Sequence, residues 1–255
     1  MGAPRERSST RLLSFSGIDG AGKTTQIRNL CARISEMGLR SELITFWDDV
    51  ATLTRLRETT GHRVFKGDKG VGTPSAPINR RDKNVRSGFM TCVRLCLYLL
   101  DAVALRSVVK KASRSDANVV IFDRFIYDEL ANLTLGNPIM RAYIWLIMKL
   151  VPRPHISYLL DADPGQARAR KPEYPLEFLL SNRQSYLDLS ELIGGITVIA
   201  PMPIEEAERE VLNFALRQLP ASTEKSKQLN PSGQPPCLFA QPQVPRSSHP
   251  TTESR

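Results

Sequence analysis

Cysteine is scarce in this chain, and the scarcity excludes two classes of protein. The 255 residues include four cysteines. They form no CxxC pair and have no histidine at ligand spacing, so neither a disulfide framework nor a zinc site is predicted. They are Cys31, Cys92, Cys96 and Cys237.

Long apolar runs are also missing. The longest apolar stretch, residues 89–109, is interrupted by Arg94, Asp101 and Arg106. Since a membrane-spanning helix needs about 18 or more nearly uncharged residues, no span is predicted. The first residues are charged and lack the apolar core of a signal peptide. We therefore expect a cytoplasmic protein without membrane contact.

The composition is that of a globular protein, 41% hydrophobic and 24% charged. A chain of this size can bury one large core without disulfides or metals. Six of the eighteen prolines fall in residues 221–255, which are also rich in Ser and Gln and are expected to be disordered. We divide the chain into an extension (1–10), a folded domain (11–219) and a tail (220–255).

β-rich runs and helical patterns alternate along the folded domain. This alternation predicts a parallel sheet covered by helices on both faces, a three-layer α/β/α sandwich with five strands. The expected strands are 11–16, 39–46, 118–123, 155–161 and 196–200. The expected helices are 23–37, 89–113, 139–150, one beginning at Pro164, 176–193 and 204–219.

The segment GIDGAGKT, residues 17–24, matches the pattern GxxxxGK[ST] between the first strand and the first helix. In such a loop glycines let successive backbone N–H groups face phosphate oxygens, and the helix N-terminus adds positive charge. Lys23 is expected to reach the β- and γ-phosphates of ATP, and the Thr24 hydroxyl to hold Mg²⁺. The expected ATP-binding residues are Gly17, Asp19, Gly20, Ala21, Gly22, Lys23, Thr24 and Thr25.

A second acidic site follows the third strand. The apolar run 119–122 ends in Asp123, where a carboxylate can meet the metal ion directly or through water. We therefore expect Asp123 to be the second protein ligand of Mg²⁺.

Three blocks together resemble the thymidylate kinases of the P-loop nucleoside monophosphate kinase superfamily. They are FSGIDGAGKTT (15–25), FDRF (122–125) and LDADP (160–164), which leads to Ala167 and Arg170. The resemblance implies a P-loop kinase fold and MgATP-dependent transfer of a phosphoryl group to dTMP, yielding dTDP. It also implies that Arg124 grips the phosphate of the acceptor.

The resemblance further implies a lid that closes over ATP, here the short segment 168–175. Joining two polyanions requires cations at the junction, and Arg168, Arg170 and Lys171 are candidates. Arg168 and Arg170 are two residues apart, so both cannot point at one spot. Arg170 is favoured because it falls on the family's recurring arginine, while a solvated helix face is the alternative.

The chain departs from the family on the acceptor side. An arginine that usually follows the second strand is replaced by the turn FWDD (46–49), and the long helix has LLDA (99–102) where the family carries a base-seating arginine. Asp19, Trp47 and Asp48 are candidates for contacting the acceptor. A buried core position is the alternative for Trp47.

Segment 61–88 is strongly basic, with seven cations against two aspartates between Arg63 and Arg86. We expect Arg80 and Arg81 in it to replace the missing arginine and bind an anionic acceptor, a solvated loop being the alternative. Apart from Phe65 the segment lacks aromatic residues on which bases stack, which disfavours a nucleic-acid partner.

Residues 89–113 carry two apolar faces, of which one can pack on the sheet. The resembling family dimerises through this helix, so a homodimer is expected, with a second layer inside the monomer as the alternative. Two other functions stay open: a kinase acting on a nucleoside or another anionic acceptor, and a non-catalytic nucleotide- or nucleic-acid-binding module.

Overall fold

The computed structural model describes residues 10–50 and 88–219. Three expectations lie outside these residues: the extension apart from Thr10, the basic segment with Arg80 and Arg81, and the tail.

The described strands form one parallel sheet, in the order β2-β3-β1-β4-β5. This confirms the predicted five-stranded α/β fold. Because all strands run in one direction, their carboxyl ends meet at a single edge, where ligands bind in open α/β sheets. The strands are β1 (Arg11–Ser16), β2 (Ser41–Thr45), β3 (Val119–Asp123), β4 (Ile156–Leu160) and β5 (Ile196–Ile199).

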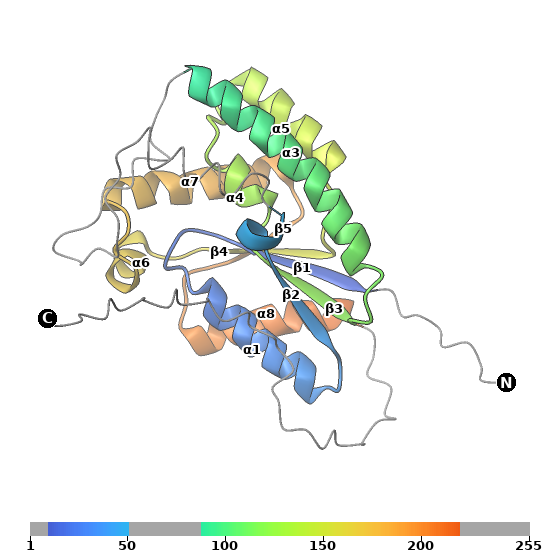
Figure 1. Cartoon of the computed structure of the whole chain (residues 1–255). Helices are drawn as coiled ribbons and strands as arrows, with labels where there is room; N and C mark the ends of the chain where they lie inside the picture. The colour runs from blue at the N-terminus through green and yellow to red at the C-terminus, as the bar shows by residue number, and fades with distance from the viewer. Residues whose placement is uncertain (1–9, 51–87, 220–255) are drawn as a thin grey trace, which may run out of the picture.

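Helices cover both faces of the sheet (Figure 1). On one face lie α1 (Lys23–Glu36) and α8 (Ile204–Gln218), and on the other α3, α4, α5 and α7. The remaining bounds are α3 (Gly88–Ala112), α4 (Ile126–Leu130), α5 (Pro138–Leu150), α6 (Pro164–Arg170) and α7 (Leu176–Ile193), with one π-helical turn, η1 (Phe46–Val50). No helix in the described ranges is both long and apolar enough to span a bilayer.

Two hydrophobic clusters hold the layers together. Successive side chains of a strand point to opposite faces, so Val120 and Phe122 of β3 join the cluster beneath α3 to α7, while Val119 and Ile121 join the one beneath α1 and α8. All four are fully buried. The uninterrupted apolar run at 119–122 is therefore explained by burial on both faces of a central strand.

Two local elements differ from the sequence prediction. The second strand ends at Thr45, not at residue 46, because the Asp49 carboxylate accepts a hydrogen bond from the Thr45 N–H (2.8 Å) and the chain turns into η1. Helix α4 was not predicted, since five residues are too short to display a helical period. The other boundaries agree with the prediction or differ from it by one or two residues.

The two apolar faces of α3 have different environments. Tyr98, Ala102 and Leu105 are buried in the core, whereas Leu100 and Val103 are 47% and 53% exposed. One face therefore packs within the monomer, as predicted, and the other has no cover in the described part of the chain.

Candidate active site

The loop between β1 and α1 is shaped by glycines. Gly17, Gly20 and Gly22 have φ angles of +139°, +84° and +89°, a region that side chains rarely adopt. A Cβ on Gly17 would lie 2.5 Å from the Leu160 carbonyl oxygen, and one on Gly20 would lie 2.3 Å from that of Ala167. The loop is thus packed directly on the backbone of β4 and α6, and only glycine fits at these two positions.

Lys23 lies beneath this loop and is buried. Its Nζ donates hydrogen bonds to the carbonyl oxygens of Gly17 (2.7 Å) and Ile18 (3.0 Å). Burial and, to a lesser extent, the Arg124 charge lower the pKa of Lys23 to about 8, against the opposing effect of nearby carboxylates. Phosphate oxygens entering the loop would offer Nζ charged acceptors in place of neutral carbonyls and favour its protonated form.

Thr24 and Asp123 are suited to a magnesium site. Thr24 is exposed at the start of α1. The Asp123 carboxyl is half-buried at the end of β3, where burial raises its pKa against the charges of Lys23 and Arg124. One hydroxyl and one carboxylate fit Mg²⁺, which takes few protein oxygens and completes its shell with phosphates and water.

Arg124 leaves β3 in an unusual conformation. Its φ of +69° makes it the one non-glycine residue with positive φ in the described ranges. The guanidinium donates to Asp19 of the loop, and its Nη1 lies 3.6 Å from Asp128. Burial opposes the charge of Arg124, but Asp19 and Asp128 outweigh burial and raise its pKa. Arg124 is therefore a permanent cation held over the phosphate loop.

The lid segment also lies against the loop. The Lys171 ammonium is 3.7 Å from Asp19 and 3.2 Å from Glu173. The Arg170 guanidinium would lie 3.9 Å from a Cβ on Gly22, so it is beside the loop. Arg168 is half-buried. Of the three candidate lid cations, Arg170 and Lys171 are thus adjacent to the loop.

Trp47 and Asp48, which were predicted to contact the acceptor, lie directly after β2. Trp47 is half-buried and packs edge-on against Phe46, while Asp48 is exposed in η1. Asp101 and Ala102, in the segment where the resemblance led us to expect a base-seating arginine, are fully buried.

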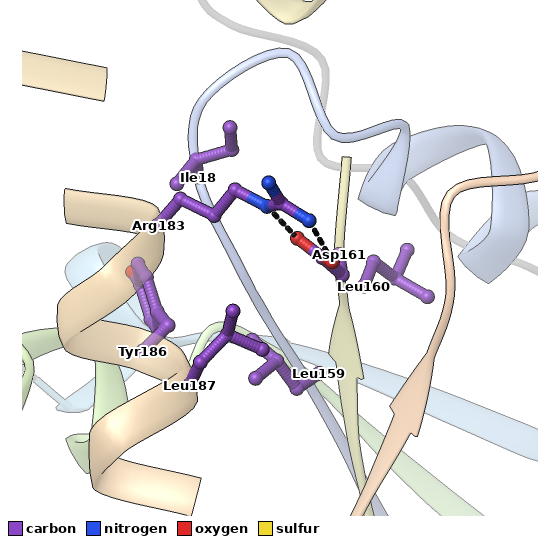
Figure 2. A pocket seen from close by; sticks show the side chains of 7 residues that line it. All are labelled: Ile18, Leu159, Leu160, Asp161, Arg183, Tyr186 and Leu187. Carbon is purple, nitrogen blue, oxygen red and sulfur yellow. Dashed lines mark hydrogen bonds and ion pairs between the residues drawn. The ribbon is translucent and has the colours of Figure 1, made fainter. Parts of the chain in front are cut away.

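Sequence reasoning missed two carboxylates at this edge. Asp128 is buried next to Arg124, and its closeness to Arg124 in the sequence was the available signal. Asp161, at the end of β4, accepts both hydrogen bonds of the Arg183 fork at 2.6 and 2.7 Å. Figure 2 shows this pair bridging α7 and β4 next to Ile18 of the phosphate loop.

Two curated proteins similar to this chain are thymidylate kinases by name. A probable thymidylate kinase of Methanosphaera stadtmanae is 23% identical over 212 residues, which cover 80% of this chain and 97% of that protein. The thymidylate kinase of Chlorobium luteolum is 27% identical, over 72% of this chain and 86% of that protein. The chain is a divergent relative of the thymidylate kinases. No protein-family model matches it.

Solved structures agree with this relationship at the level of the fold. The thymidylate kinase of Candida albicans superposes with a TM-score of 0.54 at 16% identity, covering 82% of this chain and 92% of that one. That of Ehrlichia chaffeensis gives 0.52 at 21%, covering 82% and 99%. The five-stranded sheet and its helices thus form a thymidylate kinase fold.

The contact between Gly20 and α6 predicts a difference between two glycine substitutions. Gly20→Ala and Gly38→Ala both place a side chain at positive φ, but Gly38 has nothing within 4 Å of a new Cβ. Gly38→Ala is expected to lower the free energy of unfolding by about 1 kcal/mol. Gly20→Ala is expected to lower the free energy of unfolding further, as measured by urea denaturation. It is also expected to weaken ATP binding, as measured by titration calorimetry. Equal losses in the two variants would contradict the described packing of the loop.

Proposed function

We propose that this protein is an MgATP-dependent thymidylate kinase that converts dTMP and ATP to dTDP and ADP in the cytoplasm. The observation that carries the proposal is the convergence of Lys23, Arg124 and the lid cations at the carboxyl edge of the sheet. Phosphoryl transfer between two polyanions needs this kind of arrangement, because charge repulsion is the main obstacle to their approach. The names of the curated relatives support the choice of dTMP.

In this mechanism an oxygen of the dTMP phosphate attacks the γ-phosphorus of ATP, and the bond from that phosphorus to the β–γ bridging oxygen breaks. The loop N–H groups and Lys23 bind the β- and γ-phosphates. Arg124 binds the acceptor phosphate, and Arg170 neutralises charge on the group in transfer. Thr24 and Asp123 would hold Mg²⁺, which when bound shields the phosphate charges.

On the acceptor side, Asp19, Trp47, Asp48, Arg80 and Arg81 are proposed to contact dTMP. Arg80 and Arg81 supply the positive charge that the family's arginine after the second strand provides. Where an arginine would seat the base, the long helix has the buried residues Asp101 and Ala102, so a kinase acting on a nucleoside or another anionic acceptor is the second candidate.

An acceptor screen tests this function. Purified protein, labelled ATP and Mg²⁺ are incubated with nucleoside monophosphates, nucleosides and single-stranded DNA. We expect label in dTDP and none on thymidine, with Lys23→Ala lowering turnover by about 100-fold or more while Lys149→Ala, an exposed lysine on α5, retains it. Transfer to thymidine instead would favour the second candidate. No transfer, with salt-sensitive DNA binding, would indicate a non-catalytic module.

The proposal includes a homodimer formed through α3. The exposed stripe on this helix contains Cys92, Cys96, Leu100 and Val103, whose spacing places them on one face. Burying such an apolar face against a second copy of the chain lowers the free energy of the dimer relative to two separate monomers.

Sedimentation velocity tests the dimer. Leu100→Glu is expected to convert it to a monomer, because a carboxylate would be buried in the apolar interface. Leu216→Glu is the control, since Leu216 is similarly exposed but lies on α8, on the other face of the sheet. A wild-type protein that sediments as a monomer at micromolar concentration would refute the interface.

A further inference from the structure

A buried carboxylate outside the phosphate loop links three separate segments. Asp128, in the first turn of α4, is 4% exposed. Its Oδ2 accepts hydrogen bonds from the Ser16 hydroxyl (2.7 Å) and the Phe125 N–H (3.1 Å). Its Oδ1 accepts one from the Tyr186 hydroxyl (2.8 Å) and lies 3.6 Å from Arg124 Nη1.

These neighbours require a carboxylate. Each of the four presents a hydrogen-bond donor, and a carboxylate is the side-chain group that accepts at both oxygens. An amide of the same shape would turn an NH₂ group toward one pair of donors. The hydroxyls of Ser16 and Tyr186 can rotate to accept, but the Phe125 N–H and the Arg124 guanidinium cannot.

Asp128 and Asp19 hold the Arg124 guanidinium from two sides, through Nη1 and Nη2 respectively. Asp19 lies in the phosphate loop, next to the expected nucleotide. Asp128 lies on α4, whose side chains are buried throughout. A bound nucleotide would therefore leave the contact between Asp128 and Arg124 in place.

Tyr186 connects the same carboxylate to the helix that follows the lid. On α7, Arg183 pairs with Asp161 and Tyr186 with Asp128, three residues apart and so on one face of the helix. The first contact fastens α7 to β4, and the second fastens it to α4 beside Arg124. The Tyr186 side chain is buried, and burial, followed by the Asp128 charge, raises the pKa of its hydroxyl well above the ordinary value. It therefore stays a donor to Asp128.

We propose that Asp128 is a positioning residue: it fixes Arg124 in the orientation that receives the acceptor's phosphate and, through Tyr186, couples that orientation to the lid helix. The inference rests on the proposed function for the identity of the acceptor. The strained φ of Arg124 is consistent with it, since a conformation of this kind persists where surrounding contacts hold it.

Steady-state kinetics of three variants test the positioning role. Asp128→Asn is expected to raise the KM for dTMP by about 10- to 100-fold and to leave the KM for ATP within about twofold. Tyr186→Phe, which keeps the pair between Asp128 and Arg124, is expected to raise the KM for dTMP by about 2- to 10-fold. Asp161→Asn is the matched control: it releases α7 from β4 without touching Arg124 and should lower the melting temperature without a selective effect on dTMP.

A purely structural role for Asp128 predicts a different pattern. Both KM values would then rise together, or all three variants would lose stability with no change in the ratio of the two KM values, and either result overturns the proposal. Should Asp128→Asn fail to fold, Tyr186→Phe still decides between the two patterns.

A crystal structure separates failure of this inference from failure of the proposed function. If the wild-type protein does not phosphorylate dTMP, the proposed function is wrong, but the position of Arg124 can still be compared between wild type and Asp128→Asn. We expect the guanidinium to leave its wild-type position in the variant. An unmoved guanidinium would contradict the positioning role whatever the acceptor is.

Discussion

The cations at the carboxyl edge of the sheet are held in place by oxygen atoms of the protein itself. Lys23 donates to two loop carbonyls, Arg124 is held between Asp19 and Asp128, and Lys171 lies near Asp19. Buried cations are costly without such partners. The carbonyls and Asp19 belong to the loop that is expected to receive ATP, so phosphate oxygens can take over their role as acceptors. The cations that would bind a polyphosphate are thus already in place before the ligand binds.

The fold determines where these groups meet. A parallel sheet brings the ends of β1, β3 and β4 to one edge, and the glycines of the phosphate loop let the backbone lie directly on β4 and α6. Three crossover connections that are far apart in the sequence supply the phosphate loop, Arg124 and the lid segment. Their proximity therefore depends on the burial of the central strands rather than on any local motif.

The features that were predictable from the sequence are local ones. The strand 11–16 and the helix 176–193 were predicted at their observed bounds, and the phosphate loop follows from eight consecutive residues. The link from Asp128 to Ser16 and Tyr186 was not predictable, because it joins residues 112 and 58 positions apart. Helix α4 was missed for a related reason: its first turn depends on the Asp128 carboxylate accepting from the Phe125 N–H, a contact that apolar periodicity does not reveal.

We propose that in this structure the loop and Lys23 form a triphosphate site that is arranged before the nucleotide binds. The most direct measurement is a crystal structure of the protein with Mg²⁺ and a non-hydrolysable ATP analogue. We expect β- and γ-phosphates bound to the N–H groups of residues 17–24, with Lys23 Nζ moved from the carbonyls of Gly17 and Ile18 to phosphate oxygens. An analogue bound elsewhere, or a loop unchanged at saturating analogue with Nζ still on its carbonyls, would contradict it.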